Sequence, residues 1–432
     1  MKSKYKIAVV GLWHLGEIFS AGLAELGHTV IGISDDKKVV DGLNNNQPPL
    51  PEPALEALIK KNITAKRLSY TTDFSQIKNC QVVWLTFDTP VDEKDNSDLS
   101  MIFQAIKKAK PYFKKDVLLV ISSQVPVGVS EKLADGLDYV YTPENLRLGE
   151  AVDCFLNPGR VIVGANNSAS LGKIKEIFAP LKTEIISMSP ISAEFGKHAL
   201  NAFLAASICF ANDLADLAEN IGADMKDISR VLKSDRRIGP KAYLDAGLSF
   251  SGGTLNRDLK VLLALAKRFK IRPSVVESLY EKNEARKNLV MERLKKILKK
   301  VKGKKIAVFG LTYKPGTKTL RRSHAMEVVK NLIQQGASLR LHDPQVSKED
   351  VADLPVKFFS DPYEAVSGAA AVVVMTPWPD FKNLQFSHLA KKTQVSAVFF
   401  DTANMFHDRE DEINKAGFIY LGIGRGQWES QL

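Results

Sequence analysis

Residues 6–11, KIAVVG, decide the fold of this chain, because they form a short apolar run that ends in glycine and precedes an apolar helix pattern at residues 19–26. Residues 305–310, KIAVFG, repeat the signal, and a second helix pattern follows at residues 325–333. A buried strand, a glycine turn and a helix form the opening unit of a doubly wound parallel sheet. The sequence therefore predicts an α/β protein with two parallel-sheet domains.

Further short apolar runs follow each opening unit, as a sheet of several strands requires. They lie at residues 30–33, 82–86 and 117–122 in the first half and at 339–342, 371–376 and 397–401 in the second. Ligands of such sheets bind at the carboxyl ends of the strands. We therefore expect the functional residues in the loops that follow these runs.

The stretch between the two sheet patterns, residues 192–286, has helical periodicity. Its apolar residues recur at spacings of three and four, as in Phe203, Ile208, Phe210, Leu214 and Leu217. One long helix is expected to begin after Ser192, whose hydroxyl caps the first turn with help from Glu194, and to end near Gly222. Such a helix packs against its twin in a homodimer or within its own chain, and we favour the homodimer. The predicted domains are 1–190, 191–300 and 301–432.

Bulk composition indicates a globular protein. The 432 residues are 45% hydrophobic and 25% charged, which is enough for two or three ordinary domains. No apolar run in the sequence is long enough to cross a bilayer and no secretory signal opens it, so we expect a cytoplasmic protein without a membrane partner. The three cysteines are scattered and lack metal-ligand spacing, which favours a reducing compartment and predicts no metal site.

The formal charge of +11 is compatible with nucleic acid, an anionic surface or small anionic ligands. Residues 286–305 form the densest basic run, and Leu289, Leu294, Ile297 and Leu298 recur within it at helical spacing. This pattern predicts an amphipathic helix with a solvated cationic face more strongly than a nucleic-acid-binding segment. We expect no nucleic-acid partner and assign part of the charge to phosphate-bearing ligands.

The first strand–turn–helix unit also predicts a dinucleotide site. Such a turn presents backbone N–H groups at the positive end of a helix dipole, which suits a pyrophosphate. Gly11 and Gly16 supply the turn and the close helix–sheet contact, whereas Trp13 replaces the middle glycine of G-x-G-x-x-G, so a purely structural turn would give the same pattern. Asp35 and Asp36 follow the second strand, where an acid binds the ribose hydroxyls and repels a 2′-phosphate. NAD is therefore predicted over NADP, with Asp35 as the ribose ligand.

Ordered matches over nearly the whole chain resemble the UDP-glucose/GDP-mannose dehydrogenase family. They are PPLPEP at 48–53, TPENLRLG at 142–149, NPGR at 157–160, EFGKHALNAFLA at 194–205, DRRIGPKAYL at 235–244, SFSGGTLNRD at 249–258 and GLTYKPGTKTLRRS at 310–323. The resemblance implies two Rossmann-like parallel-sheet domains joined by a central helical dimerisation domain. It also implies NAD-dependent oxidation of the C6 hydroxyl of a nucleotide sugar, with UDP-glucose as the first guess, in polysaccharide biosynthesis.

The resemblance implies a role for several groups of residues. Removing the hydroxyl proton while hydride passes to nicotinamide needs a proton-holding set, and Lys197, Asn201 and Asp258 match the family's set, with Glu144 matching the residue that activates water. The implied cofactor contacts are Gly11, Leu12, Trp13, Leu15, Gly16, Asp35, Thr89, Ser123, Gln124 and Arg321. The implied substrate contacts are Asn145, Leu146, Arg147, Arg237, Lys241, Tyr243, Phe250, Gly252, Gly253 and Lys314.

The match fails at the residue on which the family's second oxidation depends. Thr254 occupies the position of the cysteine that holds the sugar aldehyde covalently, and a threonine hydroxyl is a weak nucleophile without an adjacent base. Leu148, Gln124 and Ala403 are further departures from the family pattern. Either the uronate forms without a cysteine thioester or the reaction stops at the aldehyde.

Two other functions remain open at the level of sequence. One is a nucleotide-sugar and NAD sensor without turnover, which the retained Lys197, Asn201 and Asp258 disfavour. The other is a dehydrogenase of a hydroxy acid, which the cationic set Arg237, Lys241 and Lys314 disfavours. Cys154 is a candidate substitute nucleophile, although a lone cysteine before Phe-Leu is more typical of packing.

Overall fold

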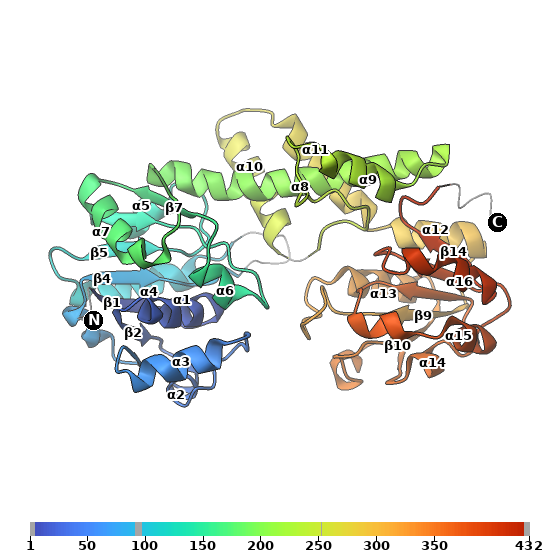
Figure 1. Cartoon of the computed structure of the whole chain (residues 1–432), viewed down its shortest axis with the longest axis horizontal. Helices are drawn as coiled ribbons and strands as arrows, with labels where there is room; N and C mark the ends of the chain where they lie inside the picture. Colours follow the sequence, from blue (N-terminus) through green and yellow to red (C-terminus); the bar gives the residue numbers. More distant parts are fainter. Residues whose placement is uncertain (1–4, 91–96, 252, 427–432) are drawn as a thin grey trace. The chain divides into compact units, whose positions relative to one another are not determined.

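A computed structural model describes residues 5–90, 97–251 and 253–426. The chain divides into two compact units, residues 1–200 and 201–432 (Figure 1). The long helix α8 (Pro190–Ile221) carries the boundary between them. The division into domains 1–190, 191–300 and 301–432 stays a prediction.

The first unit is built on one eight-stranded sheet in the order β3-β2-β1-β4-β5-β6-β7-β8. Neighbouring strands are parallel except β6 and β7, which are antiparallel. The order 3-2-1-4-5-6 is that of a doubly wound dinucleotide-binding sheet, as predicted. The strands are β1 (Lys6–Val10), β2 (Thr29–Ile33), β3 (Leu68–Thr71), β4 (Val82–Leu85), β5 (Leu118–Ile121), β6 (Tyr139–Tyr141), β7 (Val161–Ala165) and β8 (Ile185–Met188).

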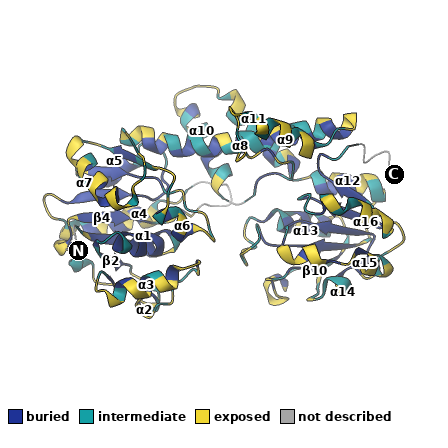
Figure 2. Cartoon of the chain, in the orientation of Figure 1, coloured by how far each residue is buried: buried dark blue, intermediate teal, exposed yellow. Residues whose placement is uncertain are grey.

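Helices cover this sheet and bury its central strands, which are dark blue in Figure 2. Every residue of β4 and β5 is buried, which explains their unbroken apolar sequences. The helices are α1 (His14–Glu25), α2 (Lys37–Asn44), α3 (Leu55–Thr64), α4 (Ser100–Ala109), α5 (Val129–Ala134), α6 (Ala151–Leu156) and α7 (Ser168–Phe178).

The second unit contains a six-stranded, wholly parallel sheet in the order β11-β10-β9-β12-β13-β14. The strands are β9 (Lys305–Phe309), β10 (Ser338–His342), β11 (Lys357–Phe358), β12 (Ala371–Val374), β13 (Val398–Asp401) and β14 (Ile419–Gly422), and its helices are α13 (His324–Gln334), α14 (Pro362–Ala365), α15 (Phe386–Lys392) and α16 (Glu410–Lys415). Both predicted sheets are thus confirmed.

The central stretch is helical, as predicted, and comprises α8, α9 (Met225–Ser234), α10 (Thr254–Arg268), α11 (Ser274–Arg286) and α12 (Leu289–Leu298). The predicted start of α8 is wrong. The helix begins before Ser192, whose backbone N–H donates to the Ser189 hydroxyl at 3.3 Å. Glu194 does not assist there, because its carboxylate accepts from the N–H groups of Gly128 and Ser130, beside the start of α5.

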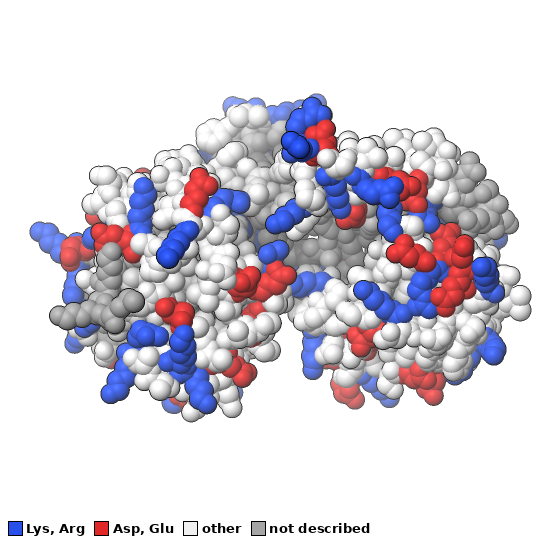
Figure 3. Space-filling view, viewed as in Figure 1, with Lys and Arg blue, Asp and Glu red and all other residues white. Residues whose placement is uncertain are grey.

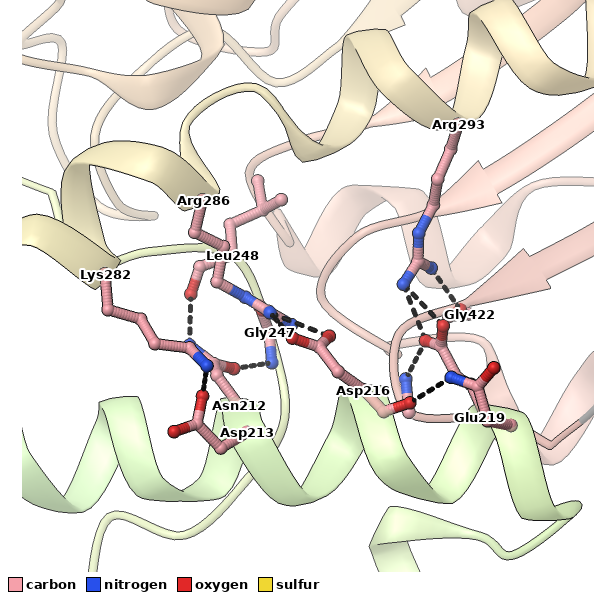
Figure 4. A network of polar contacts seen from close by, with 12 residues as sticks. Asn212, Asp213, Asp216, Glu219, Gly247, Leu248, Lys282, Arg286, Arg293 and Gly422 are labelled. Atoms are coloured by element: carbon pink, nitrogen blue, oxygen red, sulfur yellow. Dashed lines mark hydrogen bonds and ion pairs between the residues drawn. The ribbon is translucent and has the colours of Figure 1, made fainter.

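A row of carboxylates fastens α8 to the following helices (Figure 4). Asp213 pairs with Lys282, and Asp216 accepts two bonds of 2.8 Å from Arg286 Nη1. The three acidic residues, the third of which is Glu219, stand three positions apart, so they share one face of α8. This face is held by α11 and α12.

The prediction of one amphipathic helix over the basic run was wrong. The run from 286 to 305 is not one helix, since α11 ends at Arg286 and α12 covers only Leu289–Leu298. Arg293 belongs to the buried side of α12, where its Nη2 lies 2.7 Å from both carboxylate oxygens of Glu219. This buried pair fixes how α12 packs on α8, because a shift that separated the two side chains would leave both charges buried and unpaired.

The surface charge is mixed on the face that Figure 3 shows, where Lys and Arg alternate with Asp and Glu over both units. No apolar run was expected to be long enough to cross a bilayer, but among the described residues one helix, α8, is long and apolar enough by length and composition. Length and composition are weak evidence for a span, and α8 carries the buried polar residues described below.

Candidate active site

The β1–α1 turn has the close packing that a dinucleotide site requires. Gly11 has a φ of +97°, and a Cβ on Gly16 would lie 1.7 Å from the carbonyl oxygen of Gly11. The Thr86 hydroxyl donates to that oxygen at 2.7 Å, which fixes the turn against β4. Only glycine at position 16 lets α1 start this close to the strand, so the backbone fits a pyrophosphate at the helix start.

Three further predicted cofactor residues lie in this turn. Leu12 and Leu15 are each 3% exposed and pack into the core of the first unit, so only their backbone groups are available to a ligand. Trp13 precedes α1 as its N-cap, is 50% exposed and makes no side-chain capping bond. The indole is therefore accessible at the helix start, where the middle glycine of the usual motif would stand.

The structure separates the two acids that follow β2. Asp36 caps α2, because its carboxylate accepts from the N–H groups of Lys38 and Val39. Asp35 is exposed and pairs with Lys108. The backbone thus uses the Asp36 carboxylate and Lys108 uses that of Asp35, and Asp35 as the ribose ligand stays a prediction.

The loops after β4 and β5 are tied together. The Ser123 hydroxyl accepts from the N–H of Phe87 at 2.7 Å, and the Thr89 hydroxyl donates to the carbonyl of Gln124 at 2.8 Å. Thr89, Ser123 and Gln124, predicted from different segments to line the nicotinamide, are thus brought together at one edge of the sheet.

The loop after β6 holds the predicted lysine. Lys197, 7% exposed on α8, donates through Nζ to the backbone carbonyl of Glu144 at 2.7 Å and lies 3.4 Å from Asn145 Oδ1. Glu144 Oε1 stands 3.8 Å from the same Nζ, while its Oε2 accepts from the N–H of Leu146 at 2.7 Å. Arg147 points elsewhere, forming an ion pair of 3.0 Å with Glu150. The ammonium is thereby held beside a carboxylate in a nearly dry setting.

Asn201 and Asp258 form a buried pair in the second unit. The Asn201 amide donates to Asp258 Oδ2, and the two residues are 5% and 0% exposed. Arg257 Nε lies 3.8 Å from Asp258 Oδ1. Asn201 is one helical turn after Lys197 on α8, so the two share a face of one helix. A buried carboxylate with an amide and a guanidinium around it can order a hydroxyl or a water.

Thr254 is the first residue of α10, and the loop before it is clamped. Asn283 holds the buried Phe250 through both backbone groups, accepting from its N–H at 2.8 Å and donating to its carbonyl at 3.3 Å. Gly253 is the N-cap of α10. Gly252 lies outside the described residues.

Of the cations predicted to hold the diphosphate in the second unit, Arg237 and Lys241 are exposed and Lys314 is partly buried. Arg237 pairs with Asp235 at 2.7 Å, and this hydrogen bond raises the pKa of the guanidinium further above its ordinary value. Lys241 and Arg321 are exposed, and Tyr243 is 49% exposed. Lys314 Nζ lies 5.8 Å from the centre of the Tyr313 ring. These placements leave the charged groups accessible to an anion.

Sequence reasoning assigned no role to Glu52, although it quoted the surrounding PPLPEP motif. The Glu52 carboxylate is buried and accepts from the N–H groups of Gly149 and Ala151, and His14 Nε2 lies 2.8 Å from its Oε1. It therefore joins the cofactor turn to the end of the Glu144 loop. The position of Glu52 between two prolines was the sequence feature that could have pointed to this role.

Sequence reasoning also assigned no role to Glu17, which lies in the first turn of α1 before the predicted helix pattern at 19–26. The carboxyl is fully buried, and burial raises its pKa to about 8, with the charges of Glu52 and Asp88 adding to a shift that the backbone at Leu50 opposes. The folded protein therefore holds a neutral carboxyl directly after Gly16 at neutral pH.

An open pocket lies beside the Glu144 loop, and Cys154 is among its lining residues. Its lining also contains Asn145, Arg160 and apolar groups such as Phe155. Cys154 thus lines the same pocket as Glu144, which the sequence alone did not indicate. Among the described residues, no three His, Cys, Asp or Glu side chains gather in a way that could hold a metal.

Two parallel-sheet units, a dinucleotide turn and a long polar-lined helix define an NAD-dependent dehydrogenase of the two-sheet type. The chain belongs to the UDP-glucose/GDP-mannose dehydrogenase family: residues 5–182 match its NAD binding domain, 191–285 its central domain and 307–408 its UDP binding domain. The predicted family, its NAD-dependent oxidation of nucleotide sugars and the cofactor are thereby confirmed.

Individual relatives agree over the full length. The UDP-glucose 6-dehydrogenase TuaD of Bacillus subtilis is 32% identical, over 97% of this chain and 93% of its own. A UDP-glucose dehydrogenase from Pyrobaculum islandicum has a TM-score of 0.85 at 26% identity, covering 94% of this chain and 96% of that one. The UDP-D-ManNAc dehydrogenase of Pyrococcus horikoshii has the same TM-score at 25% identity, covering 98% and 100%.

The Glu17 carboxyl gives a pH-dependent prediction. Unfolded glutamate ionises near 4.5 and the folded residue near 8, so unfolding releases a proton between these values and stability falls as pH rises through that window. Glu17→Gln removes the loss, so we expect the variant to be more stable than the wild type by several kcal/mol at pH 8 and to differ little at pH 4. Urea unfolding at both pH values measures this.

The matched control is Glu56→Gln on the exposed side of α3, which should leave the pH dependence of unfolding unchanged. Equal stabilities of wild type and Glu17→Gln at pH 8 would show that the folded protein accommodates the ionised carboxylate without cost.

Proposed function

We propose that this chain oxidises the primary alcohol of a nucleotide sugar, UDP-glucose or a close relative, with NAD, and that no thioester to the protein forms. The observation that carries the proposal is the buried Asn201–Asp258 pair with Lys197 one turn away on α8. Burying a carboxylate and a lysine costs free energy even when each has a polar partner, and such groups gather at functional sites. A sensor that only binds needs neither.

The choice of substrate class rests on the second unit and on relatives. The family's UDP binding domain covers residues 307–408, which include Lys314 and Arg321. The relatives are named for UDP-glucose and for UDP-D-ManNAc, two sugars on the same nucleotide. Cations such as the exposed Arg237 and the partly buried Lys314 suit a diphosphate, and nothing favours a hydroxy acid as substrate.

The residues contribute to the first oxidation in distinct ways. NAD, when bound, supplies the hydride acceptor. Lys197 exchanges its bond to the Glu144 carbonyl for one to the substrate hydroxyl, and its charge stabilises the developing alkoxide. Asp258, held by Asn201, orders the water that takes the hydroxyl proton. The two loops that carry Thr89 and Gln124 keep water from the nicotinamide position.

Thr254 and Glu144 together disfavour the covalent route. None of residues 249–258 is a histidine that could act as a base for the Thr254 hydroxyl. The Glu144 carboxylate already accepts a hydrogen bond from the N–H of Leu146. The polar machinery for ester formation and hydrolysis is therefore weaker than that for hydride removal.

The catalytic role of Lys197 is tested with Lys197→Met, which keeps the length and removes the charge. We expect NADH formation from UDP-glucose to fall about 10²- to 10⁴-fold while the affinity for NAD is unchanged. Stopped-flow absorbance and NAD titration measure the two quantities, and Lys175→Met on the exposed face of α7 is the control. Wild-type protein that binds NAD and UDP-sugars but forms no NADH from any UDP- or GDP-hexose would overturn the proposed function in favour of a sensor.

We also infer that two copies associate through α8. Phe203, Phe210 and Leu217 are spaced seven residues apart and are 70%, 50% and 62% exposed, which leaves an apolar stripe along the helix. A seven-residue apolar repeat is the pattern by which two helices pack along their length. The cytoplasmic location stays a prediction, supported by three free cysteines.

Replacing the middle residue of the stripe tests association. Phe210→Asp should convert a wild-type dimer into a monomer in light scattering coupled to gel filtration, because a charge cannot be buried there unpaired. Phe103→Asp makes the same change on α4, where the ring is 40% exposed, and should leave the mass unchanged. A wild-type monomer, or a Phe210→Asp dimer at micromolar concentration, would contradict the inference.

A further inference from the structure

The side chain of Arg322 lies against the loop that carries Thr254. A Cβ placed on Gly253 would stand 2.8 Å from Arg322 Nη1 and 3.6 Å from its Cζ. The guanidinium therefore occupies the space that any side chain at position 253 would fill. Gly253 adjoins the residue that stands where the family has its cysteine.

Both sides of this contact are fastened. Ser323 caps α13 with its hydroxyl, which also donates to the Leu311 carbonyl at 2.6 Å. His324 Nε2 lies 2.9 Å from the Ser249 hydroxyl, which joins the start of α13 to the start of the loop. The Asn283 clamp on Phe250 holds the loop from its other side. The approach of Arg322 is therefore built into the second unit.

The backbone of Arg322 is unusual for an arginine. Its φ is +58°, in the left-handed region that a residue with a side chain enters only when its surroundings impose it. Arg257 stands one turn after Thr254 on α10, beside Asp258. Position 254 thus has a guanidinium in the adjoining loop and another on its own helix face.

We infer that Arg322 is a catalytic residue of the second oxidation, in which its guanidinium binds the oxygen of the sugar aldehyde and of its hydrate and so replaces the covalent capture that Thr254 cannot provide. This inference rests on the proposed function. It commits the chain to the uronate, where the sequence left the aldehyde open.

The steps balance without a protein adduct. After the first hydride has left, water adds across the carbonyl: a C–O bond forms, the C=O π bond breaks, and the carbonyl oxygen gains a proton, giving the hydrate R–CH(OH)₂. The hydrate then loses a hydride to a second NAD and a proton to water, giving R–COOH, which ionises. Arg322 stabilises the negative charge that builds on the carbonyl oxygen as water adds. This electrostatic stabilisation takes the place of covalent capture by a cysteine thiolate.

The test measures how many NADH form per sugar and what product remains. The wild type should give two NADH per UDP-glucose and the UDP-uronate, identified by mass spectrometry. Arg322→Gln should slow the second oxidation about 100-fold while the first hydride transfer keeps its rate, so that one NADH forms rapidly and the aldehyde accumulates as a trappable oxime with hydroxylamine. Lys330→Gln, on the exposed part of α13, is the control.

Two further variants separate chemistry from packing. Gly253→Ala leaves a helical backbone of φ −96° and ψ −8° that alanine adopts freely, but its Cβ displaces the guanidinium, so it should reproduce the aldehyde phenotype. Millimolar guanidinium ion added to Arg322→Ala should restore part of the second NADH. An unchanged two-to-one stoichiometry in Arg322→Gln and Gly253→Ala overturns the inference. So does an equal loss of both hydride transfers, which would make Arg322 structural. No NADH from the wild type would instead overturn the proposed function.

Discussion

The constraint on which the rest depends is the fixed position of α8. Its acidic face is held by Lys282, Arg286 and Arg293, and the last of these is buried against Glu219. Glu219 also accepts from the N–H of Gly424, just after β14. A helix held along this row cannot rotate, so the orientation of Asn201 toward Asp258 is set by ion pairs several turns away. The Asn201–Asp258 pair therefore depends on the same helix face that this row of charges holds.

The chemistry follows from what stands at the start of α10. Sulfur there captures a carbonyl because a thiolate is abundant and soft near neutral pH, whereas a threonine hydroxyl has neither property. Within the second unit, Arg322 fills the space next to Gly253. A guanidinium stabilises charge on the oxygen of the sugar aldehyde, and no bond between the sugar and the protein has to form and then break. On this reasoning we propose that the second oxidation proceeds through a hydrate and not through an ester.

The fold was predictable from sequence where one local rule decided it. KIAVVG and KIAVFG became β1 and β9 because buried parallel strands are continuous apolar runs with glycine turns. The short strands β6 to β8 were not predicted, since runs of three to five residues carry too little pattern. The start of α8 was misplaced because two serines, Ser189 and Ser192, offer equivalent caps in sequence, and only the fold assigns Glu194 to another segment.

The candidate site also contains residues that the sequence predicted and residues that only the fold revealed. Lys197, Asn201 and Asp258 were predicted from a resemblance and a four-residue spacing, and the structure pairs the latter two. Glu17, Glu52 and Arg322 were missed, because their meaning lies in contacts between segments far apart in the chain. A buried carboxyl within an apolar helix, and an arginine against a glycine 69 positions away, leave no local signature.

The most direct measurement is the intact mass of the wild-type protein, quenched in acid during a single turnover with UDP-glucose and excess NAD. The account predicts an unmodified chain at every time point, even while both hydrides are being released. A transient mass increase equal to the acyl-sugar nucleotide, mapped to Thr254 or to Cys154, would contradict it and restore a covalent mechanism.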